Sequence, residues 1–374
     1  MVKNKSSITN GAVDKGKKLL KKFGLTPLMI WIGVSGFSIV MVATLLIVFW
    51  PAGQLDNVVN DVLSNVNNDE CEFRSNLDGK CVENDQNTLP IVVMIDNHVD
   101  ARPPEGIDEA SIVFEAIAEG TITRLVAVFD MNMEPTDIGP VRSARPYFVD
   151  YATEFGAVYA HVGGSDEALS ILQRRKSVYD LNEFSNAAYF WRDPARVAPH
   201  SVMTSSELLK RAIETKEWST QSSFGSWIFR PEVDKEDRGD MISARIDYRS
   251  LVHNITWVYD NEENVYWRSQ GGLKHKMADG TQLSAKNIAI VYTESTPIDD
   301  YGRRRTTTIG SGKAVVLQEG YAIEAKWQRD NLNDRTRFYD NETGNEINFV
   351  PGQTWIEVIP DHFPEIEIKY SDEE

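Results

Sequence analysis

Residues 89–130 read LPIVVMIDNHVDARPPEGIDEASIVFEAIAEGTITRLVAVFD and contain three short apolar runs, over 89–96, 111–117 and 124–130. Each run is rich in Ile, Val, Leu, Phe and Ala and is separated from the next by polar residues, Gly or Pro. Short runs of this composition are typical of buried β-strands rather than helices. We therefore predict that these three segments form the first strands of the folded part of the chain.

Helix signals alternate with strand signals in the residues that follow. A Ser and a Pro begin a helix that we predict over 143–155, and the strand 157–162 comes next. Ser165 caps a second predicted helix, which has two acids in its first turn. The sequence TSSE at 204–207 is a capping box before a third helix. This alternation predicts a mixed α/β domain over residues 89–230, with helices covering a sheet.

The pattern changes after the polar run 231–240, where strand signals and short turns follow one another without helices. We predict a mostly antiparallel β domain over residues 241–365 and an acidic tail over 366–374. The predicted strands are 242–248, 255–259, 265–268, 314–317, 321–327, 337–339 and 354–359. Four tryptophans lie in or near them, and we expect these to fill the core, with stacking on a ligand as the alternative. They are Trp257, Trp267, Trp327 and Trp355.

An uncharged apolar segment precedes the folded part. Residues 28–50 are 23 residues without a charge, which suffices for a helix to cross a hydrocarbon core of about 30 Å. The tail 1–27 has seven lysines and one aspartate, which predicts a cytoplasmic N-terminus and extracellular main domains. A cleaved signal peptide is the alternative, but the apolar run is longer than a signal-peptide core. We therefore predict a single-pass protein of the cell membrane, with the membrane itself as a partner of residues 28–50.

The net charge of −17 combines unlike regions. The basic tail contributes +6, so the remainder of the chain carries −23. An acidic surface repels the phosphate backbone, and we therefore predict no nucleic-acid partner.

Residues 51–88 are predicted to be an acidic linker. Cys71 and Cys81 enclose a short loop within it. Outside the cytoplasm, such a pair most simply forms one disulfide. The spacing does not match the redox motif C-x-x-C, and zinc needs more ligands than this loop supplies.

Polar side chains gather around the end of the first predicted strand. Asp96 and Asn97 end that strand, and ligands of α/β folds bind at strand ends. The alternative is a turn in which one of the two side chains bonds the backbone.

Three residues are candidates for acid–base catalysis. Glu115 and Glu119 flank the apolar residues 116–118, and we expect them to share a strand face. Two carboxyls can act as acid and base when their surroundings separate their pKa values. The alternative is neutralisation by Arg124 or Arg142. His161 is the third candidate, at a strand end before a Gly-rich turn.

A compact loop, GPVRSARP at 139–146, presents two guanidiniums before a helix start. Arginine forks and helix N-termini both suit carboxylates or phosphates, so we expect an anionic ligand here. Pairing with Glu115, Glu119 or Asp150 is the alternative. The predicted ligand-binding residues are Asp96, Asn97, Arg124, Arg142, Ser143, Arg145, Gly163, Gly164, Ser165, Arg192 and His200.

Metal binding has little support in the spacing of the histidines. A set made of Asp96, His98, His161 and His200 contains neither H-x-H nor H-E-x-x-H. We predict no metal site and no cofactor.

Three long strings make the chain similar to the YerB-like family, whose function is not established and whose members are typically lipid-anchored. They lie within 91–129, 138–169 and 310–359, so the resemblance covers both predicted domains. The resemblance implies a two-domain extracytoplasmic protein at the envelope of Gram-positive-type bacteria. The chain departs from the family in having an apolar membrane segment where its relatives have a lipid anchor.

Two functional hypotheses follow. The first is a non-catalytic envelope module that binds a cell-wall polymer, a peptide stem or an envelope protein through the arginine loop. The second is a hydrolase or lyase that acts on envelope glycan with Glu115 or Glu119 as acid or base. Burial of both glutamates in ion pairs would remove the reason for the second hypothesis.

Overall fold

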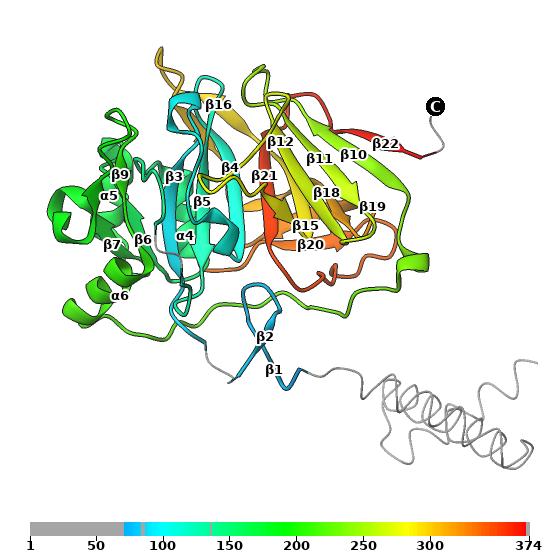
Figure 1. Cartoon of the computed structure of the whole chain (residues 1–374), viewed down its shortest axis with the longest axis horizontal. Coiled ribbons are helices and arrows are strands. Elements are labelled where there is room, and N and C mark those ends of the chain that lie inside the picture. The colour runs from blue at the N-terminus through cyan, green and yellow to red at the C-terminus, as the bar shows by residue number, and fades with distance from the viewer. Residues whose placement is uncertain (1–70, 84–86, 135–136, 372–374) are drawn as a thin grey trace, which may run out of the picture. The chain divides into compact units, whose positions relative to one another are not determined.

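The computed structural model describes residues 71–83, 87–134 and 137–371, and β-strands dominate its fold (Figure 1). The predicted tail 1–27 and membrane segment 28–50 lie outside the described residues. Within the described part of the chain, no helix is long and apolar enough to cross a membrane.

A mixed sheet of ten strands forms the centre of the fold (Figure 1). Its strands are β3 (Ile91–Asp96), β4 (Ile112–Glu119), β5 (Ile122–Phe129), β6 (Val158–His161), β7 (Tyr179–Asn182), β15 (Asn287–Thr293), β18 (Gly310–Gln318), β19 (Tyr321–Arg329), β20 (Arg337–Asp340) and β21 (Thr354–Pro360). Their spatial order is β20-β19-β18-β15-β21-β4-β5-β3-β6-β7. The pairs β3–β6, β6–β7, β15–β21 and β4–β21 are parallel, and the others are antiparallel.

The ten-stranded sheet runs through both predicted domains. Strands from 89–230 form one half of it, and strands from 241–365 form the other. The halves join where β21 pairs with β4, with Glu357 opposite Glu115. All seven residues of β21 are buried, as expected for a strand covered on both faces.

A second sheet of six strands covers part of one face. It contains β10 (Met241–Ile246), β11 (Ile255–Asp260), β12 (Val265–Gln270), β13 (Leu273–Lys274), β14 (Ser284–Ala285) and β22 (Glu367–Tyr370). The short strand pairs are β1 (Phe73–Arg74) with β2 (Cys81–Val82), β8 (Trp191–Arg192) with β9 (Val202–Met203), and β16 (Ser295–Pro297) with β17 (Arg304–Thr306). Single 3-10 turns are η1 (Val99–Ala101), η2 (Ile107–Glu109), η3 (Glu183–Ser185), η4 (Ala187–Tyr189) and η5 (Lys235–Asp237).

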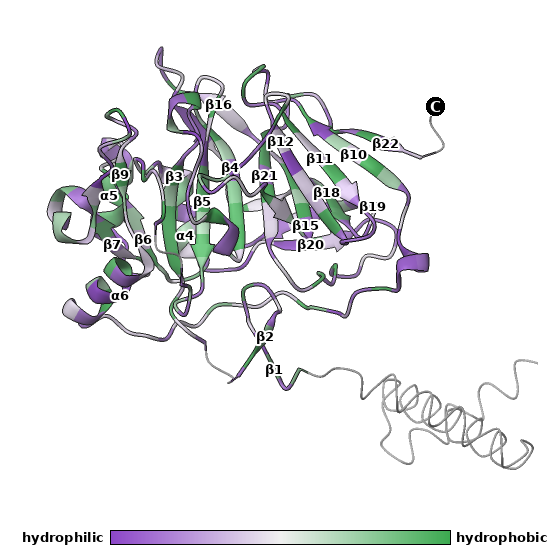
Figure 2. Ribbon diagram, viewed as in Figure 1, coloured by the Kyte–Doolittle hydropathy of each residue, from purple (hydrophilic) through white to green (hydrophobic). Residues whose placement is uncertain are grey.

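Hydrophobic side chains on the two faces of the central sheet enter separate cores. Ile91 and Val93 of β3 pack in one core with the second sheet and with helix α6 (Ser206–Thr215). Val92 and Met94 point the other way and pack with helices α4 (Pro146–Thr153) and α5 (Asp166–Arg174). The alternation of β-strand side chains produces this division, and Figure 2 shows the hydrophobic residues concentrated in the central strands.

Several local predictions are confirmed, but the α/β class of the first domain is not. The side chain of Ser165 caps α5 by accepting from the Ala168 N–H. Helix α4 begins later than predicted, at Pro146, and Ser205 caps α6. Strands alternate with helices only from α4 to β7, because β3, β4 and β5 pair antiparallel without a helix between them. The fold is therefore β-rich with few helices.

The predicted disulfide between Cys71 and Cys81 is present, with 5.4 Å between the Cα atoms. It joins the ends of the hairpin β1–β2, and this hairpin is docked on the folded body. Leu77 is buried in the core on the α4 side, and the Gly352 N–H donates to the Asp78 carbonyl at 2.7 Å. The described second half of the predicted linker is therefore packed chain.

The tryptophans mainly have the predicted core role. Trp257 and Trp355 are fully buried, Trp327 is nearly so, and Trp267 is partly buried. Stacking on a ligand is therefore not available to the first three.

Candidate functional site

A pocket of 760 Å³ lies beside the end of β3, where the segment 100–103 meets the segment 193–200. Its charged or titratable lining residues are Asp100, Arg102, Asp193, Arg196 and His200. The other lining residues are small, namely prolines, alanines and one valine. The pocket therefore lies next to the strand end at which the sequence predicted a site, although neither Asp96 nor Asn97 lines it.

Asp96 lies directly behind this pocket and is almost fully buried. Its Oδ2 atom is 2.8 Å from Arg142 Nε and 2.6 Å from His200 Nδ1. Its Oδ1 atom accepts the His98 backbone N–H at 3.0 Å. Asp96 therefore holds three parts of the site together, and it orients the His200 ring toward the pocket.

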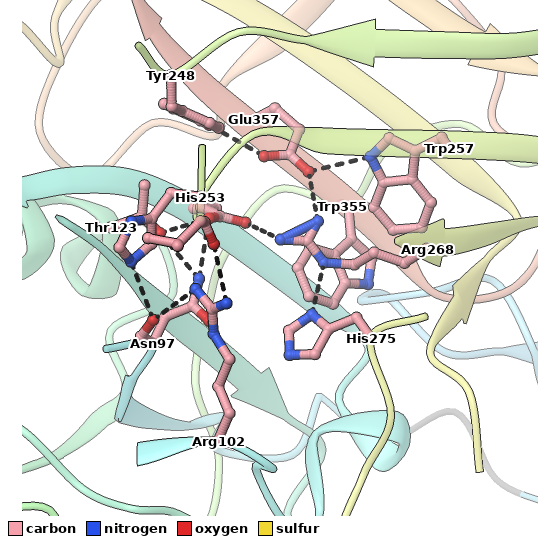
Figure 3. Close-up of polar contacts among 12 residues, drawn as sticks. Asn97, Arg102, Thr123, Tyr248, His253, Trp257, Arg268, His275, Trp355 and Glu357 are labelled. Carbon is pink, nitrogen blue, oxygen red and sulfur yellow. Dashed lines mark hydrogen bonds and ion pairs between the residues drawn. The ribbon is translucent and has the colours of Figure 1, made fainter. Parts of the chain in front are cut away.

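Asn97 points inward and connects the pocket with a buried polar network (Figure 3). Its Nδ2 atom donates to Glu115 Oε1 at 3.1 Å and to Thr123 Oγ1 at 2.8 Å. Its Oδ1 and carbonyl oxygen accept from Arg102 at 3.2 and 3.0 Å, and His253 Nε2 lies 3.2 Å from the same carbonyl. Arg102 thus lines the pocket and also holds the residue that binds Glu115.

The centre of the buried network is an ion cluster between the two sheets (Figure 3). The parallel pairing of β4 with β21 places Glu115 beside Glu357. Arg268, from β12 of the second sheet, pairs with Glu115 Oε2 and lies 3.4 Å from Glu357 Oε1. All three side chains are fully buried.

Neutral groups complete the cluster. Trp257 Nε1 donates to Glu357 Oε1 at 3.1 Å, and the Tyr248 hydroxyl donates to Oε2 at 3.0 Å. Arg268 Nε donates to His275 Nδ1 at 3.1 Å, and its guanidinium carbon lies 4.4 Å from the Trp355 ring centroid. These contacts satisfy most of the polar atoms, as burial of an ion cluster requires.

Burial shifts the pKa values of the cluster strongly. Burial, followed by the charge of Glu115, raises the pKa of Glu357 to about 8. Burial also raises the pKa of Glu115, against the opposing effect of Arg268. Burial and the charge of Arg102 lower the pKa of His253 to about 4. Burial therefore favours the protonated form of both carboxyls, while Arg268 opposes it.

The expectation that Glu115 and Glu119 share a strand face is wrong. The register of β4 against β5 shifts between Ile117 and Glu119, so a β-bulge turns the later side chain to the opposite face. Glu115 faces the second sheet, whereas Glu119 pairs with Arg124 at 3.2 Å and with Arg145. Both predicted catalytic carboxyls are therefore engaged in ion pairs, and they do not converge on one ligand.

The third catalytic candidate, His161, is fully buried away from the pocket lining. Its Nδ1 lies 2.7 Å from the Gly163 carbonyl, and its Nε2 lies 2.8 Å from Asp180 Oδ1. Both ring nitrogens serve local structure at the start of the turn before α5.

The predicted ligand-binding residues divide into separate groups. Asp96 contacts both Arg142 and His200, of which His200 lines the pocket, whereas Asn97 turns to Glu115. Arg124 and Arg145 instead meet at Glu119, and Arg124 also donates to the Ser143 carbonyl at 2.9 Å. The two loop arginines therefore serve different carboxylates. Gly163 and Gly164 form the turn before α5, and Ser165 caps this helix. Arg192 forms an exposed ion pair with Glu183.

Sequence reasoning missed Arg102, Arg268 and Glu357. The sequence could have indicated two of these, because a single charged residue within an apolar strand is expected to be buried and therefore to need a partner of opposite charge. Arg268 lies in VYWRSQ and Glu357 in TWIEVIP. The identity of the partner could not be read locally, since Glu115 and Glu357 are far apart in the sequence.

This fold, two sheets around a buried ion cluster with a pocket at the end of β3, is that of a two-domain family of unknown function, as comparison with known families shows. Residues 77–219 match the family described as "Protein of unknown function (DUF3048) N-terminal domain", and residues 244–356 match its C-terminal domain. The chain belongs to this YerB-like family, as the sequence resemblance predicted.

A relative and a solved structure agree with this assignment. The chain is 33% identical over 275 residues to the protein named "Putative lipoprotein YerB" of Bacillus subtilis (strain 168). The aligned region covers 73% of this chain and 81% of the relative. The crystal structure of the Bacillus subtilis YerB protein matches with a TM-score of 0.71 at 31% identity. That match covers 80% of this chain and 100% of the solved chain.

Proposed function

We propose that this protein is an extracytoplasmic envelope module, held at the membrane by residues 28–50, that binds a component of the cell wall in the pocket beside β3. The proposal rests on one observation, the pocket of 760 Å³ whose walls are fixed from behind by Asp96 and Asn97. The similarity to a relative named as a putative lipoprotein supports placement at the envelope.

The lining of the pocket favours a ligand with both charges and small apolar groups. Arg196 is used to fix the pocket wall, because it donates to the carbonyls of Ala101 and Pro103, each at 2.8 Å. Asp193 is occupied by Arg196 at 3.1 Å and by the Ala195 N–H at 2.8 Å, so Asp100 is the lining carboxylate that can meet an amine or hydroxyl, next to a methyl-rich surface that includes Val197. The peptide stem of a wall polymer combines amines, carboxylates and methyl groups, and we propose it as the ligand class.

Binding is preferred over hydrolysis because of the state of the two carboxyls. Glu115 is fully buried and paired with Arg268, and Glu119 is paired with two arginines. A glycosidase of the usual type needs two carboxyls about 5–10 Å apart across one sugar bond. Because Glu115 and Glu119 point to opposite faces of the sheet, the reason for the hydrolase hypothesis is removed.

The test is co-sedimentation of the full chain, in detergent, with purified peptidoglycan. Val197 is 81% exposed and lines the pocket, so Val197→Trp should fill the pocket without disturbing the core. We expect this change to weaken binding at least tenfold. Leu273→Trp is the matched control, because Leu273 is 76% exposed and lies outside the pocket lining.

Two results would contradict the proposal. Equal binding by Val197→Trp and the unchanged protein would exclude the pocket as the site. Release of soluble glycan fragments by the unchanged protein over a long incubation would instead favour hydrolysis.

A further inference from the structure

We propose that His98, Asp100 and His200 form a binding site for a divalent transition metal, of which zinc fits best, on the wall of this pocket. One ring nitrogen of each histidine and one carboxylate oxygen of Asp100 lie within 4.8 Å of one another. His98 and Asp100 come from the turn η1, and His200 comes from the facing segment.

The pair His98 and Asp100 has the spacing of two zinc ligands. His98 Nδ1 lies 3.5 Å from Asp100 Oδ2. Two ligands on a tetrahedral zinc with bonds of about 2.0–2.2 Å are separated by about 3.4 Å. His98 Nδ1 accepts the Asp100 backbone N–H at 3.2 Å, so its one lone pair becomes available to an ion only when this hydrogen bond is given up. A cation between Nδ1 and Oδ2 would replace that hydrogen bond by two ligand bonds.

A buried carboxylate orients the third ligand. Asp96 Oδ2 can only accept a hydrogen bond when ionised, so His200 Nδ1 is the donor at 2.6 Å. This bond fixes the tautomer in which His200 Nε2 has a free lone pair, and Nε2 has no hydrogen-bond partner among the described residues. Most metal-binding histidines donate their second nitrogen to a carboxylate or carbonyl in this way. Arg142, at 2.8 Å, holds Asp96 from its other side.

The remaining geometry allows the three ligands to close on an ion. The rings of His98 and His200 are stacked, with centroids 4.9 Å apart and 15° between their planes, which keeps His98 beside the lining residue His200. Contraction by about 1.4 Å and a rotation of the ring of His98 would complete the site. The side chain of Asp100 is 72% exposed and is therefore free to move.

Two nitrogens and one oxygen are a zinc donor set that leaves a fourth position open. That position would face the pocket and take water or an anionic group of the ligand, a role that rests on the proposed function. This proposal departs from the prediction of no metal site, because the members of the set come from two distant segments and have no ligand spacing in the sequence.

The test uses the full chain, purified in detergent without a histidine tag, stripped of metal and titrated with Co²⁺ alone. We expect one Co²⁺ to bind with the visible absorption of a tetrahedral site, and Zn²⁺ to displace it. His98→Asn keeps an acceptor for the Asp100 N–H, and Asp100→Asn keeps the side-chain shape. Each should weaken Co²⁺ binding at least tenfold, and Asp96→Asn should weaken it about 10–100-fold.

The chain offers a matched control. His362 Nδ1 lies 3.5 Å from Asp361 Oδ1, the same spacing at a second exposed pair. His362→Asn should leave Co²⁺ binding unchanged. The proposal is overturned if the unchanged protein binds no Co²⁺ as a tetrahedral site, or if His98→Asn binds it with the original affinity. Because no wall polymer is present, failure here would leave the proposed function intact.

Discussion

Glu357→Gln should change the pH dependence of stability in a defined window. Burial, and then the charge of Glu115, raises the pKa of Glu357 to about 8 from an ordinary value of 4.5. Between these two values the folded carboxyl retains a proton that the unfolded one has lost, so a rise in pH favours unfolding. The full effect is about 5 kcal/mol, at about 1.36 kcal/mol for each pKa unit.

Histidines act in the opposite direction at lower pH. Burial lowers the pKa of His253 to about 4, so its contribution to stability increases as pH rises from 4 to 6.5 and is then constant. The pKa of His275 is lowered as well, by burial and by Arg268. The range from pH 6.5 to 8 is therefore where Glu357 dominates. There the free energy of unfolding of the unchanged protein should fall by about 2 kcal/mol.

The amide in Glu357→Gln imitates the protonated carboxyl. It can accept from Trp257 and pair with the Tyr248 hydroxyl, and it cannot lose a proton. We therefore expect the variant to gain about 2 kcal/mol relative to the unchanged protein as pH rises from 6.5 to 8. Urea unfolding of residues 71–374, which form one compact unit, can be followed by tryptophan fluorescence across this range.

The control is Glu365→Gln, because Glu365 is 69% exposed and pairs only with Lys313 at the surface. Its pH profile should run parallel to that of the unchanged protein. If the profile of Glu357→Gln is also parallel between pH 6.5 and 8, the assignment of a retained proton to this cluster is incorrect.

Two further stability predictions can be measured by the same unfolding assay. Glu119→Gln leaves two buried arginines without their carboxylate and should destabilise the fold by about 3 kcal/mol. As a control, Arg192→Ala at an exposed ion pair should change the free energy of unfolding by less than about 1 kcal/mol. Similar losses in both variants would show that the ion pairs of Glu119 do not stabilise the fold. Replacement of both Cys71 and Cys81 by Ser should cost about 3 kcal/mol, because the disulfide closes a short loop that is docked on the body; an unchanged urea midpoint would show that the hairpin is not part of the cooperative unit.

Much of the strand pattern could be predicted because it is local. The apolar runs at β3, β4 and β5 and the hairpin at β18–β19 lie close to where the residue pattern places them. The strand β15 was missed, although its sequence NIAIVYT is a continuous apolar run. The α/β class predicted for the first domain is not confirmed, since a strand pattern does not say whether the next strand follows by a tight turn or after a connecting helix.

The pocket position was also predictable in part. The sequence predicts both Asp96, at a strand end, and His200 as ligand-binding residues, and the two side chains contact each other in the structure. The bulge in β4 could not be read from the sequence, and it reversed the orientation of Glu119. One extra residue in a strand is enough to move a side chain to the opposite face.

By itself, the sequence determined local properties: an uncharged segment long enough for a membrane, a disulfide loop, the Ser165 cap and the strands with their buried character. These depend on hydropathy, spacing and capping within a few residues of each position. Only the tertiary structure decided that β21 pairs with β4, which places Glu357 beside Glu115, and that His98 lies against His200. Such contacts join segments about 100–250 residues apart, and the free energy that selects them comes from packing two sheets around a shared core, which no local pattern records.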